Sequence, residues 1–175
     1  LDNGEKPSVI SALMKYETTE RARDVVNHGM DIVAGAGISK GPRNVLGNAY
    51  QAIPVGITVE GSNTLTRSLI IFGQGLNKSH PHIFNVLNSI LNDDLDDFKI
   101  HLKKIVGFSL KLYGKSLNIF DDSLNQQINN FACLTNFVAL KGGKLKSEQM
   151  LSGAMADVFS NLYLAQSVKY YHIHY

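Results

Sequence analysis

Glu60 is the residue whose position and surroundings most favour chemistry. It is the only acidic residue between Asp31 and Asp93, and it lies after an apolar segment and directly before a predicted helix start. A helix N-terminus stabilises a carboxylate by about 0.3–1 kcal/mol, whereas apolar burial disfavours the charged form. If a ligand sealed the site, burial would dominate and leave a carboxylate able to take a proton. The other interpretation is an ordinary acid at a helix start, and spacing alone leaves both open.

A second candidate is the glycine-rich segment GAGISKG, residues 35–41. A dinucleotide-binding fingerprint follows a strand and opens a helix, whereas this segment follows a predicted helix and runs into Pro42. The spacing from Gly37 to Gly41 is also one residue too long. The segment therefore indicates either a helix stop or a bare backbone turn that a phosphate can approach.

The sequence predicts no metal site and no nucleophile motif. Its one cysteine, Cys133, excludes an internal disulfide and a zinc site built from cysteines. The pairs His80–Pro–His82 and His172–Ile–His174 do not have the spacing of a helical zinc pair with a third ligand. Neither a phosphate-binding loop nor a serine nucleophile elbow occurs along the chain.

Composition limits the class of protein. The chain has 175 residues, of which 44% are hydrophobic and only 18% are charged, and its formal net charge is +2. Such a balanced charge argues against a nucleic-acid partner, and no apolar run approaches the roughly 18 residues of a membrane span. A chain poor in charge often buries surface against a partner or against other parts of its own protein. Because the first residue is Leu1, we expect an internal or C-terminal piece of a longer intracellular protein.

Apolar periodicity predicts helices along nearly the whole chain. The predicted fold is an all-α helical bundle in two parts, residues 1–78 and residues 79–175, with the boundary near residues 76–79. Ser62 is predicted to cap a helix that ends at Gly73–Gly75, and Ser147 to cap the last helix. Residues 52–59 are predicted as an extended loop because of Pro54 and Gly56. The other expected helices are residues 7–30, 44–51, 82–91, 95–115, 124–141 and 147–169, with the acidic residues 93–97 forming the start of one of them.

One long segment resembles a known family. Residues 49–75, AYQAIPVGITVEGSNTLTRSLIIFGQG, followed by His80 and Pro81, closely resemble the acyl-CoA dehydrogenases, above all the long bacterial type used in fatty-acid β-oxidation. The first predicted helix, with ALMKY at residues 12–16 and TERAR at residues 19–23, is similar to its family counterpart. The segment MDIVAGAG at residues 30–37 is similar as well. The helices after Pro81 fit the additional C-terminal region of that bacterial type.

The resemblance implies a C-terminal part of an FAD-dependent enzyme. The family fold has an N-terminal helical domain, a middle β-domain and a C-terminal four-helix bundle, and this chain would begin inside the bundle. The implied reaction oxidises a fatty acyl-CoA to a trans-2-enoyl-CoA. Glu60 matches the catalytic glutamate that takes the α-proton, and Gly61 matches a residue against the acyl-CoA, where a side chain would block the thioester.

The resemblance also implies FAD contacts. Ser62 and Thr64 match positions that contact FAD at the start of a helix. Asp31, Ala34 and Gly35 match a backbone turn near the FAD pyrophosphate of a neighbouring subunit.

Partners and location follow from the same resemblance. They are a fatty acyl-CoA substrate, an electron-transfer flavoprotein as acceptor and a homo-oligomer, in the bacterial cytoplasm or peripheral to the inner membrane. We expect the isolated chain to be inactive. Two alternatives are a helical interaction or oligomerisation module with a decayed site and an acyl-CoA oxidase-like flavoenzyme. Asn48, in place of a common arginine, and Ala34, in place of a common glycine, support the first alternative.

Overall fold

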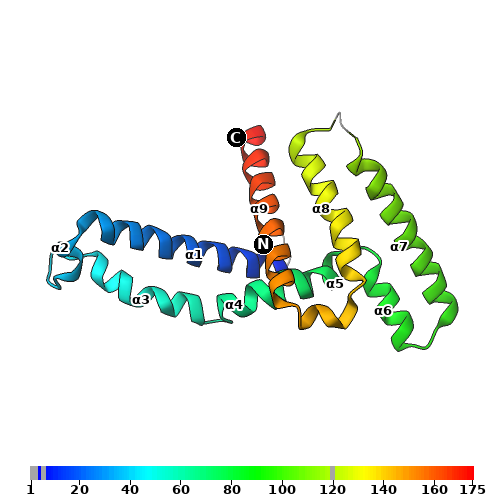
Figure 1. Ribbon diagram of the computed structural model, residues 1–175, viewed down its shortest axis with the longest axis horizontal. Helices are drawn as coiled ribbons and strands as arrows, with labels where there is room; N and C mark the ends of the chain where they lie inside the picture. Colours follow the sequence, from blue (N-terminus) through cyan, green and yellow to red (C-terminus); the bar gives the residue numbers. More distant parts are fainter. Residues whose placement is uncertain (1–3, 5–6, 119–120) are drawn as a thin grey trace. The chain divides into compact units, whose positions relative to one another are not determined.

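The computed structural model describes residue 4, residues 7–118 and residues 121–175 of the chain. These residues form helices and, within the described part, no strands (Figure 1). The all-α prediction is therefore confirmed. The chain divides into two compact units, Leu1–Ile71 and Phe72–Tyr175.

The first unit is built on two long helices that lie side by side. Helix α1, Ser8–Val33, is followed by the short helix α2, Gly35–Ile38, and the chain then returns along α1 as helix α3, Leu46–Thr58 (Figure 1). Asn44 caps α3, because its Oδ1 accepts hydrogen bonds from the backbone N–H groups of Leu46 and Gly47 at 3.1 and 2.7 Å. Helix α1 thus begins and ends close to its prediction, and α3 is longer than predicted.

Helix α3 passes through the segment predicted as an extended loop, so that prediction is wrong. Pro54 lies inside the helix, where a proline costs about 3 kcal/mol because it lacks an N–H and crowds the preceding turn. Packing against α1 outweighs this cost. A Cβ added to Gly56 would lie 3.7 Å from the Thr19 side chain, and one added to Gly29 would lie 3.0 Å from that of Leu46. Glycines therefore let the two backbones approach closely.

The helix after Ser62 begins as predicted and continues further than predicted. Ser62 caps the helix α4, Asn63–Leu65, with its Oγ accepting from the N–H of Leu65 at 3.3 Å. A π-helix, Thr66–Gln74, and the helix α5, Gly75–Ser79, follow, so the predicted stop at Gly73–Gly75 is wrong. The wider turns of a π-helix change which side chains face the protein interior. Here Ile71 and Phe72 are buried, whereas Leu65 is 44% exposed.

The second unit is a series of helices, each in contact with the next. They are α6 (Ile83–Leu91), α7 (Leu95–Ser116), α8 (Ser123–Ala139), a 3₁₀ turn (Gly142–Lys146) and α9 (Gln149–His174). The predicted bounds agree within a few residues, except that α9 extends five residues further. Ser147 does not cap α9, since its hydroxyl donates to the carbonyl of Lys144. The acidic start is confirmed, because Asp94 caps α7 with bonds from the N–H groups of Asp96 and Asp97 at 3.1 and 2.9 Å.

Aromatic side chains form part of the core of the second unit. Phe72 packs edge-on against Phe131 with ring centroids 6.4 Å apart, and Phe131 stacks on Phe159 at 6.2 Å. Met155 and Ala156, which precede Phe159 in α9, are also buried. Such ring pairs add about 0.5–1.5 kcal/mol each beyond area burial, so they join the π-helix, α8 and α9.

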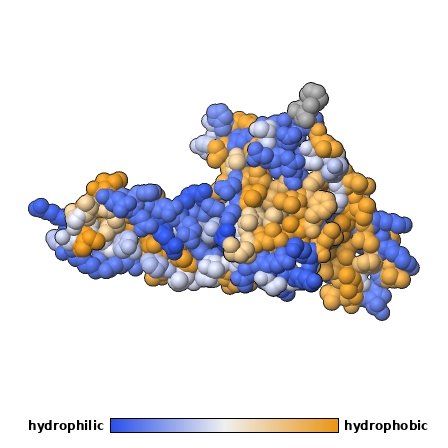
Figure 2. Space-filling view, in the orientation of Figure 1, coloured by the Kyte–Doolittle hydropathy of each residue, from blue (hydrophilic) through white to orange (hydrophobic). Residues whose placement is uncertain are grey.

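The second unit also exposes a large apolar surface. Figure 2 shows apolar residues gathered over the helices of this unit. None of the described helices is both long and apolar enough to cross a membrane. Exposed apolar area of this kind is typical of a face that contacts another protein. The exposed apolar side chains of α6–α8 include Phe84, Leu91, Ile100, Val106, Leu110, Phe137 and Leu140.

His80 makes the stability of the second unit depend on pH. Its Nδ1 accepts hydrogen bonds from the N–H groups of His82 and Ile83 at 3.2 and 3.1 Å, and its ring lies 5.4 Å from that of Phe108. Burial, and then neighbouring His82, lower the pKa of His80 below its ordinary value of 6.5, and nearby Asn136 opposes this shift. The stabilisation from neutral His80 is therefore complete above pH 6.5 and is lost as the pH falls through the folded-state pKa.

We predict that replacing His80 by asparagine, which keeps a hydrogen-bond acceptor but does not titrate, reduces this pH dependence. The measurement is urea unfolding at about pH 7.5 and about pH 5.5, on either side of the usual histidine range. The unmodified protein should lose more stability between the two pH values than the variant does. Equal losses in both proteins would contradict the assignment to His80.

Candidate functional site

Glu60 lies in a tight turn between α3 and α4. Val59 ends α3 in an extended conformation, Glu60 has φ +56° and Gly61 has φ +88°, and Ser62 then caps α4. Glu60 is exposed and lies outside the first turn of α4, which contains no acidic residue. Glu60 therefore lies before the helix start, where the helix dipole acts more weakly than within the first turn.

The backbone of Glu60 is strained. A left-handed φ is uncommon for residues other than glycine, asparagine and aspartate, and it costs of order 1–3 kcal/mol at a site that does not relax. Such strain persists where surrounding contacts fix the backbone, and it concentrates at functional sites. Within the described residues, the N–H of Glu60 donates to no acceptor. The turn therefore presents both a carboxylate and a free backbone donor to solvent.

Gly61 is required by the backbone itself. At φ +88° an L side chain is strained, although a Cβ there would meet nothing closer than the Oγ1 of Thr66 at 3.8 Å. The glycine at this position is thus explained without a ligand. Ser62 and Thr64 follow on the same side of the turn, half-buried and exposed respectively.

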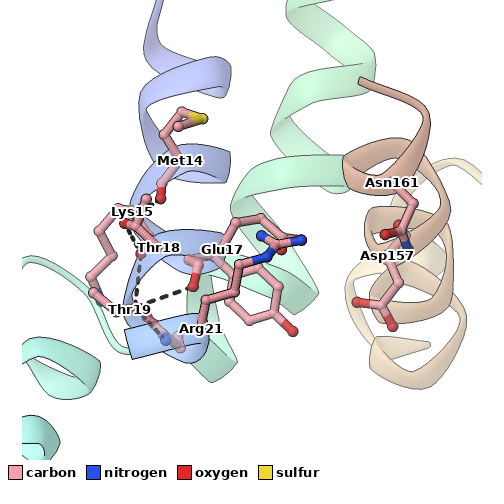
Figure 3. A network of polar contacts seen from close by, with 10 residues as sticks. Met14, Lys15, Glu17, Thr18, Thr19, Arg21, Asp157 and Asn161 are labelled. Atoms are coloured by element: carbon pink, nitrogen blue, oxygen red, sulfur yellow. Dashed lines mark hydrogen bonds and ion pairs between the residues drawn. The ribbon is translucent and has the colours of Figure 1, made fainter. Parts of the chain in front are cut away.

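Lys15 of α1 donates hydrogen bonds to this turn and to the residues on either side of it. Its Nζ donates to the Gly61 carbonyl at 2.9 Å, to the Ile57 carbonyl at 3.3 Å and to Oδ1 of Asn63 at 2.6 Å. Thr19 lies one turn further along α1, and its hydroxyl donates to the carbonyl of Lys15 at 2.7 Å (Figure 3). Lys15 is therefore half-buried against the turn and is not part of a solvated charged face of α1.

Asn63 connects the turn to α1. Only 3% of it is exposed, and its Nδ2 donates to Oε1 of Glu20 at 2.7 Å and to Oγ1 of Thr19 at 2.9 Å. Neither Asn63 nor Lys15 carries a sequence pattern that singles it out, because they are 48 residues apart along the chain. A polar residue directly after a helix cap is the only local signal for Asn63.

Two family comparisons match separate parts of the chain. Residues 1–73 match the model of the acyl-CoA dehydrogenase C-terminal domain, and residues 117–174 match that of the bacterial-type acyl-CoA dehydrogenase C-terminal region.

The chain belongs to the acyl-CoA dehydrogenase family. The first match contains the whole α1–α3 pair and the Glu60 turn, and the second covers α8 and α9. The resemblance to the bacterial type is therefore confirmed. No solved structure matches the chain.

The other candidate residues lie at the far end of the α1–α3 pair. Asp31 is in the last turn of α1, and Ala34 and Gly35 form the link to α2. All three are exposed. Helix α3 has 13 residues, which corresponds to about 20 Å at 1.5 Å per residue, so these residues and the Glu60 turn do not contact the same small group.

This separation bears on how FAD would fit. The open space around Gly35, where an added Cβ meets nothing within 4 Å, suits a backbone approached by a ligand. A ligand at this segment and a ligand at the Glu60 turn would contact opposite ends of α3. Gly37 in the same segment has a packing role, since a Cβ there would lie 2.8 Å from the Val33 side chain.

The backbone of Ala34 is also strained. Its φ of +48° and ψ of −130° belong to a region that glycine occupies readily and alanine does not. A glycine would therefore adopt this conformation with less strain than Ala34 does.

We predict that Ala34→Gly stabilises the protein by about 1 kcal/mol, since relief of strain exceeds the added chain entropy. Ala36→Gly, two residues along in α2, is the matched control and should cost about 0.5–1 kcal/mol. Urea unfolding measures both. Destabilisation by both variants would show that Ala34 is not strained in the folded protein.

Proposed function

We propose that this chain is the C-terminal part of an FAD-dependent acyl-CoA dehydrogenase that oxidises fatty acyl-CoA to trans-2-enoyl-CoA in fatty-acid β-oxidation. One observation carries the proposal. Glu60 is held in a left-handed conformation on an exposed turn, and among the described residues neither its carboxylate nor its N–H has a hydrogen-bond partner. A carboxylate and a backbone donor are the two groups that α-proton abstraction from a thioester needs.

In this proposal Glu60 acts twice. Its carboxylate takes the α-proton, so the Cα–H bond breaks and its electron pair becomes part of the new Cα–Cβ double bond. Its N–H donates to the thioester oxygen, where negative charge develops during proton removal. Gly61 leaves the approach to the thioester free of a side chain. FAD, when bound, supplies the acceptor for the hydride that leaves Cβ.

The proposed FAD contacts are Ser62 and Thr64 beside the Glu60 turn, and Asp31, Ala34 and Gly35 toward the FAD of a second subunit. This arrangement requires a homo-oligomer in the intact enzyme, and the exposed apolar surface of the second unit supports association. We further propose an electron-transfer flavoprotein as electron acceptor and the bacterial cytoplasm, or the inner membrane surface, as location.

Anaerobic titration of the intact flavoprotein with a series of saturated acyl-CoAs tests the proposal. The expected result is loss of the oxidised flavin absorbance together with formation of trans-2-enoyl-CoA, while the isolated chain is inactive. An absence of flavin reduction by every acyl-CoA would overturn the proposal and favour a helical oligomerisation module, which the apolar surface of α6–α8 also suits. Rapid reaction of the reduced flavin with oxygen would identify an acyl-CoA oxidase instead.

A further inference from the structure

We propose that Lys15 is a positioning residue that fixes the Glu60 turn in its reactive geometry; this inference rests on the proposed function of Glu60. Lys15 is half-buried on α1, and its ammonium donates three hydrogen bonds, to Ile57, Gly61 and Asn63. An ammonium has three N–H donors, so all of them are used on this turn.

The three acceptors lie on both sides of Glu60. The Ile57 carbonyl is three residues before it, the Gly61 carbonyl is one residue after it, and Asn63 begins α4. A single cation therefore connects the end of one helix, the strained turn and the start of the next helix. This supplies the surrounding constraint that a left-handed glutamate needs in order to persist.

Charge supports the same role. The Ile57 carbonyl belongs to the last turn of α3, where a helix presents partial negative charge that a cation stabilises. The three acceptors of Lys15 are neutral oxygens, and Glu20, which accepts a hydrogen bond from the same Asn63 amide, forms its ion pair with Arg23 at 3.4 Å. The ammonium of Lys15 is therefore directed to the turn by neutral acceptors.

Replacing Lys15 by methionine in the intact enzyme tests the inference. Methionine keeps the length and apolar stem of lysine and removes the three hydrogen bonds. Lys103→Met is the matched control, because Lys103 is an exposed lysine of α7 in the other unit. Turnover is expressed per bound flavin, so that a loss of folded protein does not affect it.

We expect Lys15→Met to lower kcat per bound flavin by about 10- to 100-fold, since displacement of a reacting group by about 1 Å costs this much. KM should change little, and the primary isotope effect with an α-deuterated acyl-CoA should rise because proton abstraction becomes slower. Hydrogen exchange of the amides of Val59, Leu65 and Thr66, which donate to Val55, to the Ser62 hydroxyl and to the Ser62 carbonyl, should become at least roughly tenfold faster, as expected for a local opening. Lys103→Met should change none of these quantities.

Exchange at the turn is measured without turnover, so it separates this inference from the role of Glu60. Unchanged exchange and unchanged kcat per flavin in Lys15→Met would overturn the inference, even if Glu60→Gln is inactive. Faster exchange in Lys15→Met together with full activity of Glu60→Gln would instead overturn the proposed function. Lys15→Gln serves as the second variant if Lys15→Met fails to load flavin. Failure of both variants to load flavin would make Lys15 a folding residue and would also overturn the inference.

Discussion

Replacing Glu60 by glutamine is expected to reduce turnover of the intact enzyme by at least roughly a thousandfold, within the range that a positioned general base contributes. Glutamine has nearly the same size as glutamate and keeps the backbone N–H, but its amide does not accept the α-proton. Because Glu60 is exposed and, within the described residues, supports no other side chain, the fold and the bound FAD should be unaffected. Steady-state turnover and flavin content together measure the effect.

Glu148→Gln is the matched control for this variant. Glu148 precedes α9 and pairs with Lys141 at 2.7 Å, so the same chemical change occurs in an exposed ion pair of the second unit. We expect normal turnover in this control. Near-normal turnover in Glu60→Gln would remove Glu60 as the base.

The second large effect concerns stability. Asn63→Ala is expected to destabilise the protein by about 2–4 kcal/mol, because it leaves a charged donor and a charged acceptor without their shared partner. The Asn63 amide is buried between the Lys15 ammonium at 2.6 Å and the Glu20 carboxylate at 2.7 Å. Urea unfolding monitored by circular dichroism measures the loss.

Asn161→Ala controls for the loss of an asparagine amide. Asn161 is exposed on α9 and donates to the carbonyl of Asp157 in the same helix at 2.9 Å (Figure 3). This exposed bond should be worth at most about 0.5 kcal/mol. An equally small loss in Asn63→Ala would mean that the Lys15–Asn63–Glu20 contacts do not stabilise the turn.

Much of the fold could be predicted because local signals agree with the final structure. Helix α7 has an acidic cap at Asp94 and a continuous apolar pattern, and Ser62 has the side chain that a helix start prefers. In both places the residues that decide the element are within a few positions of one another. Sequence alone therefore gives the type and approximate bounds of these helices.

The errors fall where distant residues decide the conformation. Pro54 and Gly56 disfavour a helix locally, yet α3 forms and packs along α1, where a Cβ added to Gly29 would lie 3.0 Å from the Leu46 side chain. The predicted stop at Gly73–Gly75 is wrong for a related reason. The chain stays helical as a π-helix up to Gln74, and Ile71 and Phe72 within it are buried. In a π-helix the side chains on one face do not repeat every 3.6 residues, so the α-helical pattern does not apply.

The candidate site shows the same division. The Glu60–Gly61–Ser62 turn could be predicted, since an acid, a glycine and a cap stand in sequence. Lys15 could not, because its partners at the turn are more than 40 residues away and its spacing on α1 is typical of a solvated face. The left-handed backbone of Glu60 is likewise visible only in the structure.

Exchange of the substrate α-hydrogen tests the role of Glu60 most directly. A saturated acyl-CoA is incubated anaerobically with the intact enzyme in D₂O, and deuterium at Cα of the recovered substrate is measured by mass spectrometry. We predict deuterium incorporation with the unmodified enzyme and none above background with FAD-loaded Glu60→Gln. Equal incorporation by both enzymes would show that another group removes the α-proton.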